Sequence, residues 1–79
     1  MSQEFTTFDL NLASTLVSLG FELLELDRTA DPRKVRFVFR QDSELGKSVE
    51  NYWANNLTVS PQELFNAQKL LKNRIYSDF

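Results

Sequence analysis

The chain has 79 residues, of which 42% are hydrophobic and 13% aromatic, and a formal charge of −2. This length predicts one small domain over residues 1–79, and the apolar content excludes intrinsic disorder as its resting state. Cysteine and histidine are both absent, which excludes disulfides and the common zinc sites, and the acidic balance gives no general attraction to nucleic acid or anionic membranes.

The first predicted element is a helix between Thr6 and Gly20. Thr6 is a suitable N-cap because Asp9 follows it at the position of a capping box. Apolar residues then recur at helical spacing, and Gly20 can adopt the left-handed conformation that ends a helix. Residues 1–5 precede this helix and are expected to be flexible.

The segment from Phe21 to Arg40 predicts a β-hairpin whose turn contains Asp31-Pro32. A register in which facing residue numbers sum to 61 matches opposite charges across the two strands. It pairs Asp27 with Lys34, Glu25 with Arg36, and Leu23 with Val38 on one face, and Leu26 with Val35 and Leu24 with Phe37 on the other.

A second helix is predicted to begin near residues 41–44 and to end at Asn55-Asn56. Its apolar side carries Leu45, Val49, Tyr52 and Trp53. The extended link at 57–59 that follows allows a short third strand. The last helix has the clearest start, because Ser60 is a good N-cap, Pro61 suits the first helical position, and Glu63 completes a capping box.

The buried stripe of this last helix is predicted to contain Leu64, Ala67, Leu71 and Ile75, widened by Phe65 and Leu70. The elements therefore follow the order α-β-β-α-α, an α+β fold in which an antiparallel hairpin packs on helices. Phe21, Leu23 and Val38 would line the second face of the hairpin. Because a helix or another subunit must cover that face, we expect a homodimer.

Catalytic chemistry has little support in the sequence. The commonest general base and the strongest soft nucleophile are absent, and no phosphate-binding loop occurs, so we expect neither an enzyme nor a cofactor. Carboxylates at Glu25, Asp27, Asp31 and Asp42 allow a Mg²⁺ site. Pairing of Asp27 and Glu25 with bases across the hairpin is favoured over a metal.

Tyr52 and Trp53 are the best candidates for contact with a protein partner, since these residue types dominate interface hot spots. Burial in the core is the alternative for both. Phe37 and Phe39 alternate with arginines as on RNA-binding sheets, but core positions are favoured for them. The second hairpin face, with Phe21, Leu23 and Val38, is a further candidate for a partner contact.

A nucleic-acid-binding role is the alternative function. It would use three bases of the last helix and two of the hairpin loop, which could meet phosphates: Lys69, Lys72, Arg74, Arg33 and Lys34. A solvated helix face explains the first three without a ligand, because bases near a helix C-terminus also suit the helix dipole.

Several segments together resemble a family of short uncharacterised proteins of bacteria, their phages and mobile elements, a domain of unknown function. They are Gly20-Phe21, the strand from Arg36 to Phe39, Tyr52-Trp53, and the helix from Val59 to Tyr76. The resemblance covers about Phe8 to Tyr76 and implies a stand-alone module. It supplies no activity and no functional residue, and it raises the expectation of a protein that binds host machinery.

The sequence therefore predicts a non-enzymatic interaction module that forms a homodimer. No apolar run approaches the roughly 20 residues that span a bilayer, and the start Met-Ser-Gln-Glu lacks the features of a signal peptide. We expect a cytoplasmic protein without membrane contact.

Overall fold

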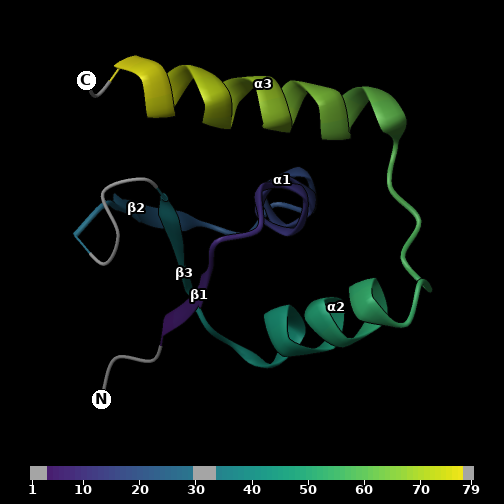
Figure 1. The fold of residues 1–79 in the computed structure, drawn as a ribbon. Helices are drawn as coiled ribbons and strands as arrows, with labels where there is room; N and C mark the ends of the chain where they lie inside the picture. The colour runs from purple at the N-terminus through teal and green to yellow at the C-terminus, as the bar shows by residue number, and fades with distance from the viewer. Residues whose placement is uncertain (1–3, 30–33, 78–79) are drawn as a thin grey trace.

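The computed structural model describes residues 4–29 and 34–77, and these form a three-stranded antiparallel sheet and three helices (Figure 1). Hydrophobic periodicity places the helices close to their predicted positions, and the α+β class is confirmed. In chain order the elements are β1 (Glu4–Thr7), α1 (Leu10–Ser18), β2 (Leu23–Asp27), β3 (Arg36–Arg40), α2 (Ser43–Trp53) and α3 (Pro61–Ser77).

The third strand is β1, at the start of the chain, and residues 57–59 form no strand. The sheet order is β1-β3-β2, with Phe5 opposite Phe39 and Thr7 opposite Phe37. The prediction of a third strand at 57–59 is therefore wrong. That prediction used only the residue types at 57–59, whereas β1 is a strand because it pairs with the edge of β3, which lies far along the chain. Of the segment 1–5, Glu4 and Phe5 lie in β1, and residues 1–3 lie outside the described residues.

The N-cap of α1 is Asp9, and the prediction of Thr6 is wrong because Thr6 belongs to β1. The Asp9 carboxylate accepts hydrogen bonds from the backbone N–H of Asn11 at 2.8 Å and of Leu12 at 3.2 Å. It thus satisfies two of the donors that a helix start leaves free. The predicted C-terminal signal is confirmed: Gly20 has a φ of 96°, and the N–H of Phe21 donates to Leu16 O at 3.1 Å, as in a Schellman motif.

The hairpin forms, but the predicted register is wrong by two residues. Asp27 faces Arg36 and Leu26 faces Phe37, so facing numbers sum to 63 near the turn. A register shift of two residues leaves each side chain on the same face of the hairpin. The alternation of apolar and polar residues alone could therefore not distinguish the two registers. An irregularity between Leu23 and Glu25 then places Leu23 opposite Phe39, on the face that carries Leu26.

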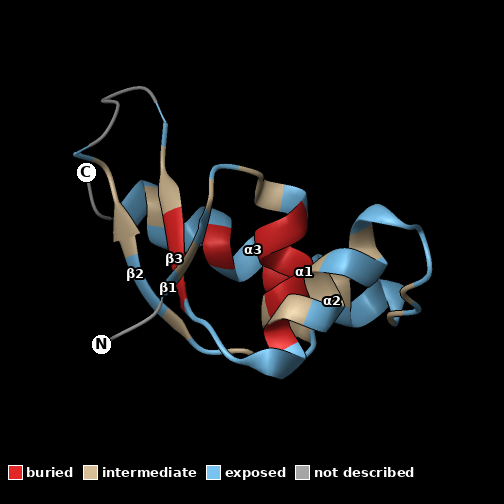
Figure 2. Cartoon of the chain, turned by 90° about the horizontal axis from the view of Figure 1, so that it is seen from below, coloured by how far each residue is buried: buried red, intermediate tan, exposed pale blue. Residues whose placement is uncertain are grey.

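Helix α1 lies at the centre of the molecule, between the sheet, α2 and α3 (Figure 1). Five consecutive residues of α1, 12–16, are buried, which requires neighbours on more than one side of a helix. Figure 2 shows the buried residues concentrated in α1 and β3. The core cluster consists of Leu12, Ala13, Leu16, Phe37, Phe39, Leu45 and Leu71. The helical half of the fold therefore meets the sheet through α1.

Candidate functional site

An open hollow of about 440 Å³ lies where the end of α2, the link to α3 and the first turn of α3 surround one side of α1. The link runs along the edge of the molecule (Figure 1). Apolar and aromatic side chains form most of its lining, which is the usual chemistry of a recognition site. We call this feature the aromatic hollow; it is lined by Thr15, Tyr52, Trp53, Asn55, Leu57, Val59 and Leu64.

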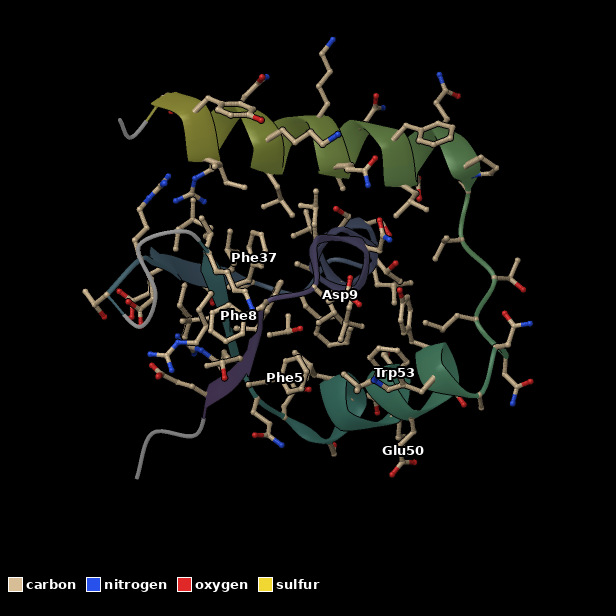
Figure 3. The ribbon with its side chains drawn as sticks, in the orientation of Figure 1. Phe5, Phe8, Asp9, Phe37, Glu50 and Trp53 are labelled. Carbon is tan, nitrogen blue, oxygen red and sulfur yellow. The ribbon has the colours of Figure 1, made fainter. Side chains whose placement is uncertain are left out.

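Helix α2 presents two neighbouring aromatic residues to different surroundings. Tyr52 is half-buried and packs against the core cluster, in line with Leu45 and Val49. Trp53 is one residue further around the helix and is 65% exposed. The two rings meet edge to face, with centroids 5.0 Å apart. In Figure 3 the Trp53 ring lies on the side of α2 that faces the other helices, whereas Glu50 points away. Tyr52 therefore joins the Trp53 ring to the core.

The end of α2 directs the chain into the wall of the hollow. Asn55 adopts a left-handed φ of 61°, and the N–H of Asn56 donates to Asn51 O at 2.8 Å. This second Schellman motif confirms the predicted helix end. It turns the chain so that Leu57 and Val59 are half-buried along the link and contribute two apolar walls.

Four side chains of the lining carry a polar group: Thr15, Tyr52, Trp53 and Asn55. Burial raises the pKa of the Tyr52 hydroxyl above its ordinary value, and the nearby Asp9 carboxylate raises it further. Tyr52 is therefore a neutral phenol at neutral pH, able to donate a hydrogen bond. The Thr15 hydroxyl already donates to Asn11 O at 2.9 Å. Such an arrangement favours binding of an apolar group with one or two hydrogen bonds, rather than bond-breaking chemistry.

The second hairpin face does not form the surface that the sequence predicts. Phe21 and Leu23 pack against the core cluster, because the irregularity in β2 turns Leu23 to the inner face. Val38 is on the outer face by alternation but is only 2% exposed. Arg36 and Arg40 share that face of β3 by alternation, and both have acidic neighbours: Asp27 forms an ion pair with Arg36, and Glu22 lies 3.7 Å from Arg40. These three candidates are therefore not an exposed apolar patch.

Phe37 and Phe39 are buried core residues, as favoured from the sequence. Their rings lie on the inner face of β3, against α1, so neither is available to stack on a base. The resemblance of this strand to an RNA-binding platform has no support in the structure.

The carboxylates that allowed a Mg²⁺ site have separate roles. Hydrogen bonds from the side chain and backbone of Thr29, with the Arg36 guanidinium, lower the pKa of Asp27 to about 2. Asp42 is the N-cap of α2 and accepts from the N–H of Leu45 at 2.8 Å. Asp31 lies outside the described residues. Across residues 4–29 and 34–77, no three acidic side chains gather in a group that could hold a metal ion.

The four nucleic-acid candidates among the described residues do not all lie together. Arg33 is outside the described residues, and the Lys34 ammonium lies 5.8 Å from the centre of the Phe8 ring, beside the sheet. Lys69 and Lys72 line a hollow of about 380 Å³ on α3, together with Phe65 and Tyr76. Arg74 is exposed but lines neither this hollow nor the aromatic hollow. Helical spacing places it on the opposite flank of α3.

Sequence reasoning missed the exposure of three apolar residues on α3. Phe65 and Leu70, predicted to widen the buried stripe, are 66% and 53% exposed, and Tyr76 is 71% exposed. The signal for Phe65 and Tyr76 was their spacing from Lys69 and Lys72, which puts all four side chains on one flank of the helix.

Comparison with known proteins gives one match. A family model described as Domain of unknown function (DUF5659) matches residues 2–77. No curated protein and no solved structure matches the chain. Among the described helices, none combines the length and the apolar character needed to cross a membrane.

Proposed function

This chain belongs to the DUF5659 family of domains of unknown function, and we propose that it is a non-enzymatic module that binds a protein partner at the aromatic hollow. The observation that carries this proposal is the position of Trp53, which is 65% exposed at the rim of an apolar hollow of about 440 Å³. A large aromatic side chain beside a concave apolar surface is the pattern of an interface hot spot.

The side chains that line the aromatic hollow determine which kind of side chain of a partner can bind there. Leu57, Val59 and Leu64 form apolar walls, and Tyr52 supplies a neutral hydroxyl. A bulky apolar side chain of the partner would bury both itself and the Trp53 ring, and each such burial contributes about 1.5–3 kcal/mol. Binding of this kind needs no cofactor, because the side chains that line the hollow supply the groups that contact the partner.

The experiment uses matched baits. The wild-type chain, Trp53→Ala and Leu70→Ala are immobilised and exposed to a lysate of the source cell, with and without nuclease. Leu70 is the control because it is a large apolar residue that is 53% exposed and lines neither hollow. We expect a protein that the wild type and Leu70→Ala retain and that Trp53→Ala loses, unchanged by nuclease.

Direct binding of that protein can then be measured by fluorescence, because Trp53 is the only tryptophan of the chain. Burial of its ring should shift the emission to shorter wavelength in proportion to the complex formed. Equal retention by wild type and Trp53→Ala, or an emission unchanged at saturation, would refute the proposal.

Self-association stays a prediction from small size. Its other basis was a second apolar hairpin face, and the packing of Phe21 and Leu23 against the core removes it. Light scattering at tens of micromolar tests the homodimer, and a monomeric mass there would refute it. The cytoplasmic location and the origin in phages or mobile elements also stay expectations.

Nucleic-acid binding is the second candidate, favoured by the exposure of Lys69 and Lys72 beside two exposed aromatic rings. Binding of this kind must weaken steeply as salt rises, because it releases counterions from the phosphates. Absence of affinity for oligonucleotides at low salt would eliminate it.

A further inference from the structure

One flank of α3 carries Phe65, Lys69, Lys72 and Tyr76, which we name the α3 stripe. All four side chains line the hollow of about 380 Å³, and Gln68 and Asn73 complete the lining. The two aromatic residues at the ends are 66% and 71% exposed. The stripe spans three turns, about 16 Å along the helix axis. It is separate from the aromatic hollow, because the two hollows share no lining residue.

The spacing of the stripe favours a helical partner. Its residues follow one another at steps of four, three and four, close to the helical repeat of about 3.6 residues, so they form one row of the kind against which an amphipathic helix sets its own i, i+4 and i+7 positions. Figure 1 shows α3 along one side of the molecule, where a second helix has room to run beside it. The stripe has an aromatic residue at each end and two bases in the middle. A helix that binds it must therefore present apolar residues to the ends and acidic residues to the middle.

The charge of the stripe is unbalanced. From Leu64 to Ser77 the chain contains three bases and no acidic residue. Among the described residues, neither Lys69 nor Lys72 forms an ion pair. Both ammonium groups are exposed, so two carboxylates of a partner could meet them with little loss of hydration.

A second copy of the chain does not fit this surface. In a two-fold symmetric contact between two α3 helices, Phe65 would meet the partner's Tyr76 and Lys69 would meet the partner's Lys72. The aromatic ends would match, but two lysine pairs would face each other, and like charges at such positions are destabilising.

A nucleic acid fits less well than an acidic helix. Only two bases lie on the stripe, whereas tight phosphate binding uses about six to ten contacts. The chain as a whole carries a formal charge of −2, which opposes a polyanion but does little against a helix that carries two carboxylates.

We propose that the α3 stripe docks an acidic amphipathic helix, which places two carboxylates against Lys69 and Lys72 and an apolar residue against each of Phe65 and Tyr76. This goes beyond the binding function of the aromatic hollow, since it gives the chain a second and chemically different interface. A chain with both surfaces could hold two partners at once.

The test uses a synthetic helical peptide with leucine, glutamate, glutamate and leucine at steps of four, three and four residues. Binding is measured by calorimetry at low and moderate salt. We expect the double variant Lys69→Glu/Lys72→Glu to bind this peptide at least about tenfold more weakly. We expect the same variant to gain affinity for a second peptide, in which two lysines replace the glutamates.

The control variant is Lys47→Glu/Arg74→Glu, which makes the same change in net charge at exposed positions off the stripe. It should keep its preference for the glutamate peptide, as should Trp53→Ala, so that the outcome is independent of the aromatic hollow. Circular dichroism establishes that each variant is folded.

Three results would overturn the proposal. They are no binding of the glutamate peptide at about millimolar concentration, equal weakening by the control variant, or no exchange of preference in the charge-reversed pair. Tight, salt-sensitive binding of a single-stranded oligonucleotide that depends on Lys69 and Lys72, with no binding of the peptide, would assign the stripe to nucleic acid instead.

Discussion

The sheet half and the helical half of this molecule use the same residue types for opposite purposes. Phe37 and Phe39 on β3 are buried, whereas Trp53 on α2 and Phe65 and Tyr76 on α3 are mostly exposed. The strand phenylalanines face α1 at every second position, so the pleat alone places them in the core. Trp53, Phe65 and Tyr76 lie outside the stripe that their helix turns to the core, whereas Tyr52 lies within the stripe of α2.

The difference shows where aromatic content serves stability and where it is available for recognition. The inner face of the sheet is covered by α1, and its outer face carries ion pairs. The helical half has two hollows, each with exposed aromatic rings, and one of them also carries two bases. Both proposed interfaces therefore lie on α2, α3 and the link between them.

The largest expected effect compares two phenylalanines that differ only in their surroundings. Phe39 is 0% exposed and Phe65 is 66% exposed. We expect Phe39→Ala to lower the free energy of unfolding by about 3–5 kcal/mol, because it removes buried contacts and leaves a cavity. Phe65→Ala should change it by less than about 0.5 kcal/mol.

Urea unfolding followed by circular dichroism measures both changes. If Phe39→Ala is unfolded in buffer, Phe39→Leu keeps the comparison measurable, with a smaller loss in the same direction. Similar losses at Phe39 and Phe65 would mean that the two halves do not divide the aromatic residues in this way.

A smaller effect is expected at the boundary between the two halves, where β1 ends and α1 begins. The Asp9 carboxylate caps α1, whereas Thr6 is exposed on β1. We expect Asp9→Ala to lower the free energy of unfolding by about 1 kcal/mol, the usual cost of a lost N-cap. Thr6→Ala is the control and should stay within about 0.5 kcal/mol. The reverse order would restore Thr6 as the cap and shorten β1.

Local signals were sufficient to predict the start of α3, the ends of α1 and α2, and the fold class, but not the start of α1. Pro61 starts α3, and the N–H of Glu63 lies 3.4 Å from Ser60 Oγ. Gly20 and Asn55 end α1 and α2 with positive φ. Each of these features depends on residues within one turn of the chain, so the sequence specifies it directly.

The features that were missed depend on distant parts of the chain. β1 is only four residues long, and it is a strand because β3 offers it a partner more than 30 residues later in the chain. The hairpin also contains an irregularity between Leu23 and Glu25, which changes the pairing of Leu23 and which no local residue type indicates. Leu57 and Val59 have the composition of a strand, but the link that contains them lies on the other side of α1 from the described strands (Figure 1).

The candidate sites show the same division. Trp53 could be singled out from the sequence because residue type alone favours it at an interface. The outward position of Phe65 could not, because the buried width of α3 is set by the approach of α1, which packs on the side with Ala67 and Leu71. A helix that packs on one neighbour buries a narrower stripe than a helix at the centre of a fold.

The smallest expected effect tests the electrostatic side of the comparison, on the outer face of the sheet. Thr29 and Arg36 lower the pKa of Asp27 to about 2, from an ordinary value of 3.8. Because the folded state holds this carboxylate ionised, its contribution to stability is complete above the ordinary pKa and is lost as the pH falls through about 2. The free energy of unfolding should therefore decline between about pH 5 and about pH 2, and part of that decline should be absent in Asp27→Asn.

Glu25→Gln is the matched control, since it removes one carboxylate from the same strand, opposite Val38 rather than a base. An identical acid decline in wild type and Asp27→Asn would mean that the contacts with Thr29 and Arg36 do not hold the Asp27 carboxylate ionised in the folded state.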